Sequence, residues 1–99
     1  MWGSMLRLGA VPIDSPLVLA PMAGVTDRDF RLIVRRIGGV GLVTMEFIAS
    51  RALVRGVART LDLMHFLPEE RPISIQIYGS DPDTMADAAR LVEAIGADI

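Results

Sequence analysis

Short apolar segments alternate with longer amphipathic ones along most of this chain, and that alternation restricts the fold more than any other feature. The apolar segments end at turn-forming residues and are predicted to be strands over residues 17–20, 42–45 and 73–77. The segments with apolar residues at helical spacing are predicted to be helices over residues 27–37, 50–58 and 82–95. A fourth strand is predicted to begin at 97–99. We therefore predict an α/β fold with a parallel sheet, its strands adjacent in chain order and its crossover helices on one outer face.

The segments on either side of the first strand predict a hairpin and a capped helix. Met5 to Leu8 and Val11 to Ile13 flank Gly9-Ala10, as the strands of a short hairpin do. Thr26 stands where an N-cap of the next helix is expected. The predicted apolar face of that helix consists of Phe30, Ile33, Val34 and Ile37. The arginines that fall mostly on its other side are Arg28, Arg31, Arg35 and Arg36.

Composition limits the class of protein. At 99 residues the chain forms at most one domain, and its 52% hydrophobic content suits strands that are buried on both faces. The longest apolar run, Leu17 to Val25, is interrupted by Pro21 and Gly24 and is too short to span a membrane. Because the chain has no cysteine and no secretory signal, we predict a cytoplasmic protein. The formal net charge of −2 lacks the basic surplus that is typical of nucleic-acid-binding proteins.

The segment Leu19-Ala20-Pro21-Met22-Ala23-Gly24-Val25-Thr26-Asp27 lies between the first strand and the next helix. Pro21 and Gly24 interrupt regular structure there, which leaves backbone N–H and C=O groups free to bond a ligand. Ala23 and Gly24 are small, so the backbone can approach a flat ring closely. The segment is either the mouth of a ligand site or an ordinary strand-to-helix turn.

Two polar residues belong to the same predicted edge, where parallel strands end and functional residues gather. Glu46 stands at the end of the second strand, and Gln76 lies in the third strand on the same side as Ser74. A buried glutamine needs partners for its donor and its acceptor. Gln76 therefore either bonds its neighbours or recognises the edge of a ligand. Asp81, just beyond this strand, is predicted to cap the next helix.

Two further features favour ordinary structural roles. Arg51, Arg55 and Arg59 recur every four residues and can form one basic stripe on a helix, which would suit RNA phosphates. Gly56 weakens that helix, so a solvated helix face is the favoured interpretation. His65 has no second metal-type ligand at a suitable spacing, and no metal site is predicted.

Taken in order, these motifs resemble those of the tRNA-dihydrouridine synthases, above all the bacterial branch of B-type and nitrogen-regulation-like enzymes. The resemblance extends from about Ile13 to Ile99. Besides Glu46 and the segment from Leu19 to Asp27, it rests on Gln76-Ile77-Tyr78-Gly79-Ser80-Asp81-Pro82, Met85-Ala86-Asp87-Ala88-Ala89 and Gly96-Ala97-Asp98-Ile99.

The resemblance implies an FMN-binding (β/α)8 TIM barrel followed by a small helical domain. Residues 1–99 would form the N-terminal portion of that barrel, about three βα units, with the remainder of the barrel and the helical domain outside this chain. The family uses FMN, with NADPH as reductant, to reduce a uridine of tRNA to 5,6-dihydrouridine. The implied partner is tRNA, with no membrane and no metal, and the full-length protein is expected to be a monomer.

The resemblance also implies roles for individual residues. Pro21, Met22 and Ala23 would line the isoalloxazine ring, and Gln76 would hydrogen-bond its pyrimidine-like edge. Glu46 would either orient the site or touch RNA. Reduced flavin passes a hydride to C6 of uracil, and the family's cysteine, in an Asn-x-Gly-Cys-Pro motif, protonates C5.

The motif with the cysteine would follow Ile99, so no catalytic residue is predicted here, and we expect the 99-residue chain alone to be inactive and poorly stable. Two alternatives stay open at this point. One is another FMN-dependent TIM-barrel oxidoreductase that resembles dihydroorotate dehydrogenase, and the other is a truncated chain without catalysis.

Overall fold

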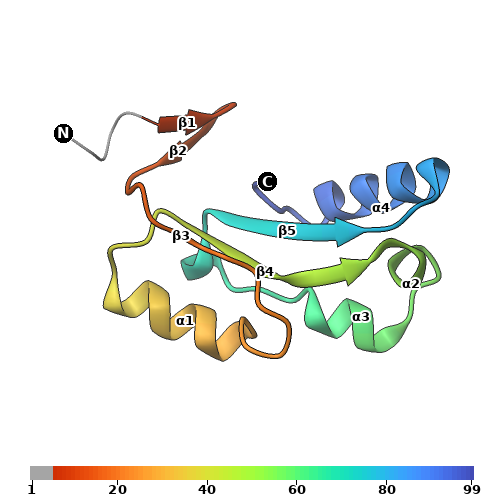
Figure 1. Ribbon diagram of the computed structural model, residues 1–99, viewed down its shortest axis with the longest axis horizontal. Coiled ribbons are helices and arrows are strands. Elements are labelled where there is room, and N and C mark those ends of the chain that lie inside the picture. The colour runs from red at the N-terminus through yellow and green to blue at the C-terminus, as the bar shows by residue number, and fades with distance from the viewer. Residues whose placement is uncertain (1–5) are drawn as a thin grey trace.

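Three parallel strands flanked by helices make up most of the computed structural model, which describes residues 6–99 (Figure 1). The strands are β1 (Leu6–Leu8), β2 (Val11–Ile13), β3 (Val18–Leu19), β4 (Leu42–Ala49) and β5 (Ile73–Tyr78). The helices are α1 (Arg28–Ile37), α2 (Ser50–Val54), α3 (Ala58–Leu63), the 3-10 helix η1 (Pro68–Glu70) and α4 (Pro82–Ala94).

The order of the sheet is β3-β4-β5, and both neighbouring pairs are parallel. This confirms the predicted parallel sheet with strands adjacent in chain order. β1 and β2 form a separate antiparallel hairpin, which is also confirmed. Gly9 allows its turn because its φ of 61° is in the left-handed region. Met5, the first residue of the predicted hairpin, lies outside the described residues.

Residues 97–99 extend beside β5 without forming a full strand. The Ile75 N–H donates to the Ile99 carbonyl over 2.9 Å, and the Asp98 N–H donates to the Ile73 carbonyl over 3.1 Å. The Asp98 carboxylate in turn accepts a bond from the Ile73 N–H over 2.9 Å. The predicted fourth strand is thus present only as the beginning of a pairing, and Asp98 has a structural partner in β5.

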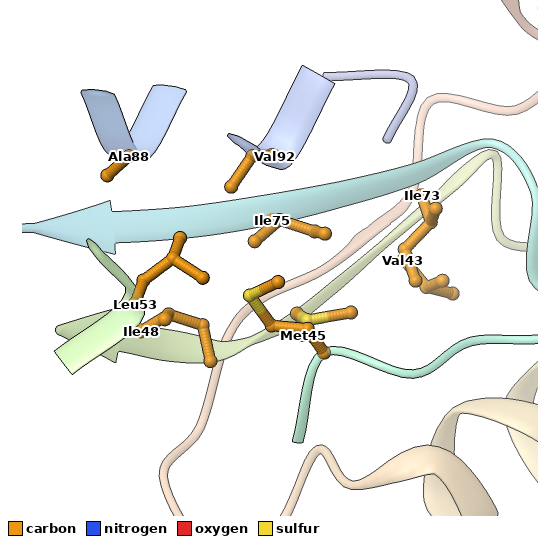
Figure 2. Packing of buried hydrophobic residues seen from close by; sticks show 9 residues of the cluster. Val43, Met45, Ile48, Leu53, Ile73, Ile75, Ala88 and Val92 are labelled. Carbon is orange, nitrogen blue, oxygen red and sulfur yellow. The ribbon is translucent and has the colours of Figure 1, made fainter. Parts of the chain in front are cut away.

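One hydrophobic cluster holds the helices against the sheet (Figure 2). Its strand residues are Val43, Met45, Ile48, Ile73 and Ile75. Leu53 of α2, Ala88 and Val92 of α4, and Met64 after α3 complete it, and Val34 of α1 packs against it. The helices therefore meet the same set of strand side chains, as predicted. Burying each of the larger side chains stabilises the fold by about 1.5–3 kcal/mol.

β4 is longer than predicted and contains a bulge. The prediction ended this strand at Met45, but β4 continues to Ala49 because Ile48 and Ala49 pair with Ile77 and Tyr78 of β5. Between the pairs Met45–Ile75 and Ile48–Ile77, β4 has one residue more than β5. Glu46 thus lies in a bulge inside the strand and not at its end.

The interface of α1 also differs from prediction. Asp27, not Thr26, caps the helix, and its side chain accepts a bond from the Phe30 N–H over 2.9 Å. Ile33 and Ile37, predicted to be buried, are 58% and 80% exposed, whereas Arg31 is 1% exposed. The reason is that the inward face of α1 carries a buried ion pair, and a purely apolar pattern does not reveal it.

Arg31 and Glu70 form that ion pair, with 2.5 Å between Nε and Oε1. The Arg31 guanidinium also donates to the Thr26 carbonyl over 2.8 Å, and the second Glu70 oxygen accepts from the Leu67 N–H over 2.7 Å. Arg35 lies one turn further along and donates to three backbone carbonyls, those of Glu70, Val40 and Pro72. Burial lowers the pKa of Arg35, and the nearby carboxylate of Glu70 opposes that shift. The two arginines join α1 to η1 and to the start of β5.

The predicted helix over 50–58 is divided at Gly56, whose φ is 71°. Arg51 belongs to α2, Arg55 follows it, and Arg59 belongs to α3. All three arginines are exposed. This agrees with the favoured interpretation of solvated helix residues, and a single basic stripe does not form because the chain turns between the second and the third arginine.

We expect Glu70→Leu, in a full-length protein that contains this chain, to lower the free energy of unfolding by about 3–5 kcal/mol, because it leaves the Arg31 charge buried without a partner. Urea denaturation measures the change. The double variant Arg31→Met/Glu70→Leu should recover much of the loss. Glu69→Leu, which removes the neighbouring exposed carboxylate, is the matched control. A single-variant loss no larger than that of the control would contradict the role of the pair.

Candidate functional site

The loop between β3 and α1 closes on Thr26, whose side chain is fully buried. Its hydroxyl accepts a bond from the Met22 N–H over 3.0 Å and donates to the Met22 carbonyl over 3.1 Å. The N–H groups of Val25 and Thr26 donate to the same carbonyl over 2.9 and 3.0 Å. Gly24 provides the reversal of the chain with a φ of 75°. The loop is therefore a defined turn and not a slack connection.

Glu46 reaches this loop from β4. Its Oε2 accepts a hydrogen bond from the Gly24 N–H over 2.8 Å. The bulge in β4 has an evident role here, because bulges redirect side chains and recur beside active sites. The structure thus brings together two of the regions that the sequence placed at one edge, the loop and Glu46.

The outer side of the loop is open. Met22 is 40% exposed, Ala23 and Gly24 are exposed, and Pro21 is half-buried. These small or flexible side chains leave the backbone accessible at the carboxyl end of β3. The geometry suits a flat ligand that rests against backbone atoms.

Gln76 lies on β5 on the opposite side from the hydrophobic cluster, because its neighbours Ile75 and Ile73 point into the cluster. Its side chain is exposed, so it does not depend on a buried partner within this chain, and its recognition of a ligand edge stays a prediction. Gln76 follows Ile75, the residue paired with Met45 beside the bulge, and so belongs to the same part of the sheet as Glu46. The hydrogen bonds of residues 6–99 include none between Gln76 and the 21–24 loop.

The connection after β5 approaches α2 closely. A Cβ atom on Gly79 would clash with the Ser50 hydroxyl, so a larger residue there would require Ser50 to move. Asp81 caps α4, as predicted, by accepting a bond from the Thr84 N–H over 2.9 Å. Hydrogen bonds from the side chain and backbone of Thr84 lower the pKa of Asp81.

Sequence reasoning missed three features of this edge. Thr26 anchors the loop and does not cap α1. Arg31 supports the Thr26 carbonyl from below. Phe47 and Tyr78 form an edge-to-face aromatic pair with ring centroids 5.1 Å apart. The local pattern contains a signal for the first, a hydroxyl four residues after Met22, whereas the other two depend on partners distant in sequence.

A hollow of about 590 Å³ lies beside the loop, between the start of α1 and the end of α3. Asp27, Arg28, Asp29, Glu46 and His65 are among its lining residues. Arg28 Nη1 lies 3.0 Å from His65 Nδ1 across it. In the part of the chain that the structure describes, no group of three or more potential metal ligands forms. None of the helices in that part is both long and apolar enough to cross a membrane.

Comparison with known proteins identifies a family whose model matches most of this chain. Residues 18–99 match the model of the dihydrouridine synthase (Dus) family. Since the match covers most of the chain, the chain belongs to the dihydrouridine synthase family.

Curated relatives agree with that assignment. The chain is 38% identical over 96 residues to a probable tRNA-dihydrouridine synthase of Rickettsia bellii, a match that covers 96% of this chain and 29% of the relative. It is 41% identical over 97 residues to a probable tRNA-dihydrouridine synthase of Mycobacterium tuberculosis (92% and 25%). It is 41% identical over 85 residues to tRNA-dihydrouridine synthase B of Xanthomonas campestris pv. campestris (86% and 25%). The matches span only 25–29% of the length of these relatives.

We expect Thr26→Val to loosen the loop, because it removes the hydroxyl that pairs with both backbone groups of Met22. Loss of a hydrogen bond of this kind costs about 1 kcal/mol. Hydrogen exchange at the Met22 and Val25 amides should become faster, while exchange in β4 stays unchanged. Thr26→Ser keeps the hydroxyl and is the matched control. Equal protection of these amides in the Val variant and the wild type would contradict the anchoring role.

Proposed function

We propose that the protein is an FMN-dependent tRNA-dihydrouridine synthase, which reduces uridine in tRNA to 5,6-dihydrouridine with NADPH. Membership of the family and the names of the relatives support this activity. The observation that carries the proposal is the open turn at Pro21–Gly24, fixed by Glu46 and Thr26 at the carboxyl edge of a parallel sheet. Ligands of open and closed parallel α/β folds bind at this edge.

The sheet fits the beginning of a (β/α)8 barrel. Three parallel strands follow in chain order, with their helices on one face, and residues 97–99 begin to pair with β5 as the next strand would. We infer that residues 1–99 form the N-terminal portion of an FMN-binding TIM-barrel domain. In that arrangement the face that carries Gln76 would line the barrel interior.

The residues at the edge fit a flavin. Met22 and Ala23 are exposed and Pro21 is half-buried, so this segment offers an accessible apolar surface that suits contact with a flat ring. The exposed Gln76 amide offers a donor and an acceptor to the pyrimidine-like edge of that ring. When bound, FMN would supply the hydride chemistry, with NADPH as its reductant.

The substrate part of the proposal is tRNA, in the cytoplasm. A uridine inside a stacked RNA must leave its stack to reach a buried reactive atom, so the site requires an accessible mouth. The chain holds no cysteine, and its residues are proposed for binding and orientation and none for proton transfer. The full-length protein is proposed to act as a monomer without a metal.

The direct test uses a full-length protein that contains this chain. We expect the purified protein to bind FMN with a flavin absorbance spectrum and to form dihydrouridine in unmodified tRNA when NADPH is supplied. Mass spectrometry of digested tRNA measures the product. Flavin reduction by dihydroorotate, without any dihydrouridine formed, would identify the other class of FMN barrel and overturn the proposal. Absence of flavin binding would overturn it as well.

We expect Gln76→Ala to weaken FMN binding roughly three- to tenfold, because it removes one neutral hydrogen bond worth about 0.5–1.5 kcal/mol. Fluorescence titration of the apoprotein with FMN measures the affinity. Ser74→Ala, two residues earlier on the same face of β5, is the matched control and should leave the affinity unchanged. Unaltered affinity in Gln76→Ala would remove this residue from the cofactor site.

A further inference from the structure

Glu46 of β4 makes the contact that joins Gly24, in the loop between β3 and α1, to the sheet. Within the turn, the Met22 carbonyl accepts the N–H groups of Val25 and Thr26, and the Thr26 hydroxyl accepts that of Met22. The Gly24 N–H takes no part in these bonds and donates to Glu46 Oε2. Among the hydrogen bonds of residues 6–99, this is the one that connects residues 22–25 to a neighbouring strand.

The bulge in β4 makes this contact possible. Val43 and Met45 point into the hydrophobic cluster, and so does Ile48 beyond the bulge. Simple alternation from Met45 would have placed residue 47 in the cluster, but the extra residue leaves both Glu46 and Phe47 outside it. The packing of Met45 and Ile48 on either side of the bulge therefore fixes the position of Glu46 outside the cluster, where it reaches the loop.

The charge of Glu46 distinguishes its two possible roles. A carboxylate repels the phosphates of RNA, whereas it is a strong acceptor for a backbone N–H. Here the carboxylate is half-buried, and one of its oxygens is already bonded to Gly24. These observations favour a contact within the protein over a contact with the tRNA backbone.

We propose that Glu46 is a positioning residue, which holds the Gly24 peptide so that the backbone of Pro21 to Ala23 keeps the shape that receives the flavin ring. This inference rests on the proposed function, since it presumes that the loop binds FMN. It assigns Glu46 an indirect role through the loop and no contact with the RNA.

Two substitutions separate the hydrogen bond from the charge. Glu46→Ala removes the acceptor, and Glu46→Gln keeps an acceptor oxygen in the same place without the charge. Glu69→Ala is the matched control, because it removes an exposed carboxylate that pairs with Arg36 on the surface. All are prepared in a full-length protein that contains this chain.

Three measurements are made on each variant: hydrogen exchange of the Gly24 amide in the apoprotein, the Kd for FMN, and the KM for tRNA. In Glu46→Ala we expect faster exchange at Gly24 and FMN binding about tenfold weaker, as expected for the loss of a hydrogen bond to a charged group. Glu46→Gln should stay within about threefold of the wild-type Kd, because a neutral acceptor keeps part of the bond. The thermal midpoint of the apoprotein should match that of the Glu69→Ala control.

Several results would overturn the inference. Unchanged Gly24 exchange or unchanged FMN affinity in Glu46→Ala would do so, as would a Gln variant as weak as the Ala variant. A rise in the KM for tRNA with normal FMN binding would show that Glu46 contacts RNA instead. If Glu46→Ala does not fold, the Gln variant still decides, because a loss of Gly24 protection in that folded variant contradicts the proposal. A wild-type protein that binds no FMN would overturn the proposed function itself, whereas normal wild-type binding with unaffected variants would overturn only the role of Glu46.

Discussion

The buried ion pair between Arg31 and Glu70 is the constraint on which the arrangement of the other parts depends. A single guanidinium joins α1 to η1 through Glu70 and to the loop after β3 through the Thr26 carbonyl. Buried charges are tolerated only when they are paired and their hydrogen-bonding groups are satisfied. Here both carboxylate oxygens are engaged, and no buried side-chain polar atom among the described residues lacks a partner. The position of the loop is therefore linked to the packing of α1 against η1.

Two layers of support define the candidate site. Arg31 of α1 holds the end of the loop through the Thr26 carbonyl, and the Thr26 hydroxyl closes the turn on Met22. From the neighbouring strand, Glu46 holds its tip at Gly24. None of these side chains needs to touch a ligand in order to matter, since a cofactor that contacts backbone atoms depends on where those atoms are held. A preorganised surface loses less conformational freedom on binding than a mobile one.

Much of the fold could be predicted from the sequence because it depends on local periodicity. The alternation of Ile73, Ile75 and Ile77 and the glycines after each helix are readable without any partner. The features that could not be predicted depend on residues far apart in the chain. Arg31 is 39 positions from Glu70, so nothing near it indicated burial. Likewise, the bulge appears only when the pairing of β4 with β5 is known. The exposed state of Gln76 also required knowledge of what faces it.

For the candidate site, the sequence placed Pro21, Met22, Ala23, Glu46 and Gln76 at one edge, and the structure brings Glu46 to the 21–24 loop, whereas the place of Gln76 in a site stays a prediction. The sequence did not reveal the two hydrogen bonds that hold the loop, one between Glu46 and the Gly24 N–H and one between Arg31 and the Thr26 carbonyl. Hydrogen bonds of this kind depend on how side chains distant in sequence are placed in three dimensions. Family resemblance identifies the residues that recur but not the contacts that hold them.

The extra residue in β4 has a consequence for how this segment tolerates change in length. Before the bulge, odd-numbered residues such as Val43 and Met45 face the helices, and after it an even-numbered residue, Ile48, does so. The residues that face the helices are thus odd-numbered before the bulge and even-numbered after it. Deleting Glu46 or Phe47 would remove the bulge and leave a regular strand in which Val43, Met45 and Ile48 still face the helices, whereas deleting a residue elsewhere in β4 would exchange inside for outside over one part of the strand. In an alignment of related chains, a one-residue gap here therefore marks the loss of the bulge beside the Gly24 loop and leaves the packing of the core in register.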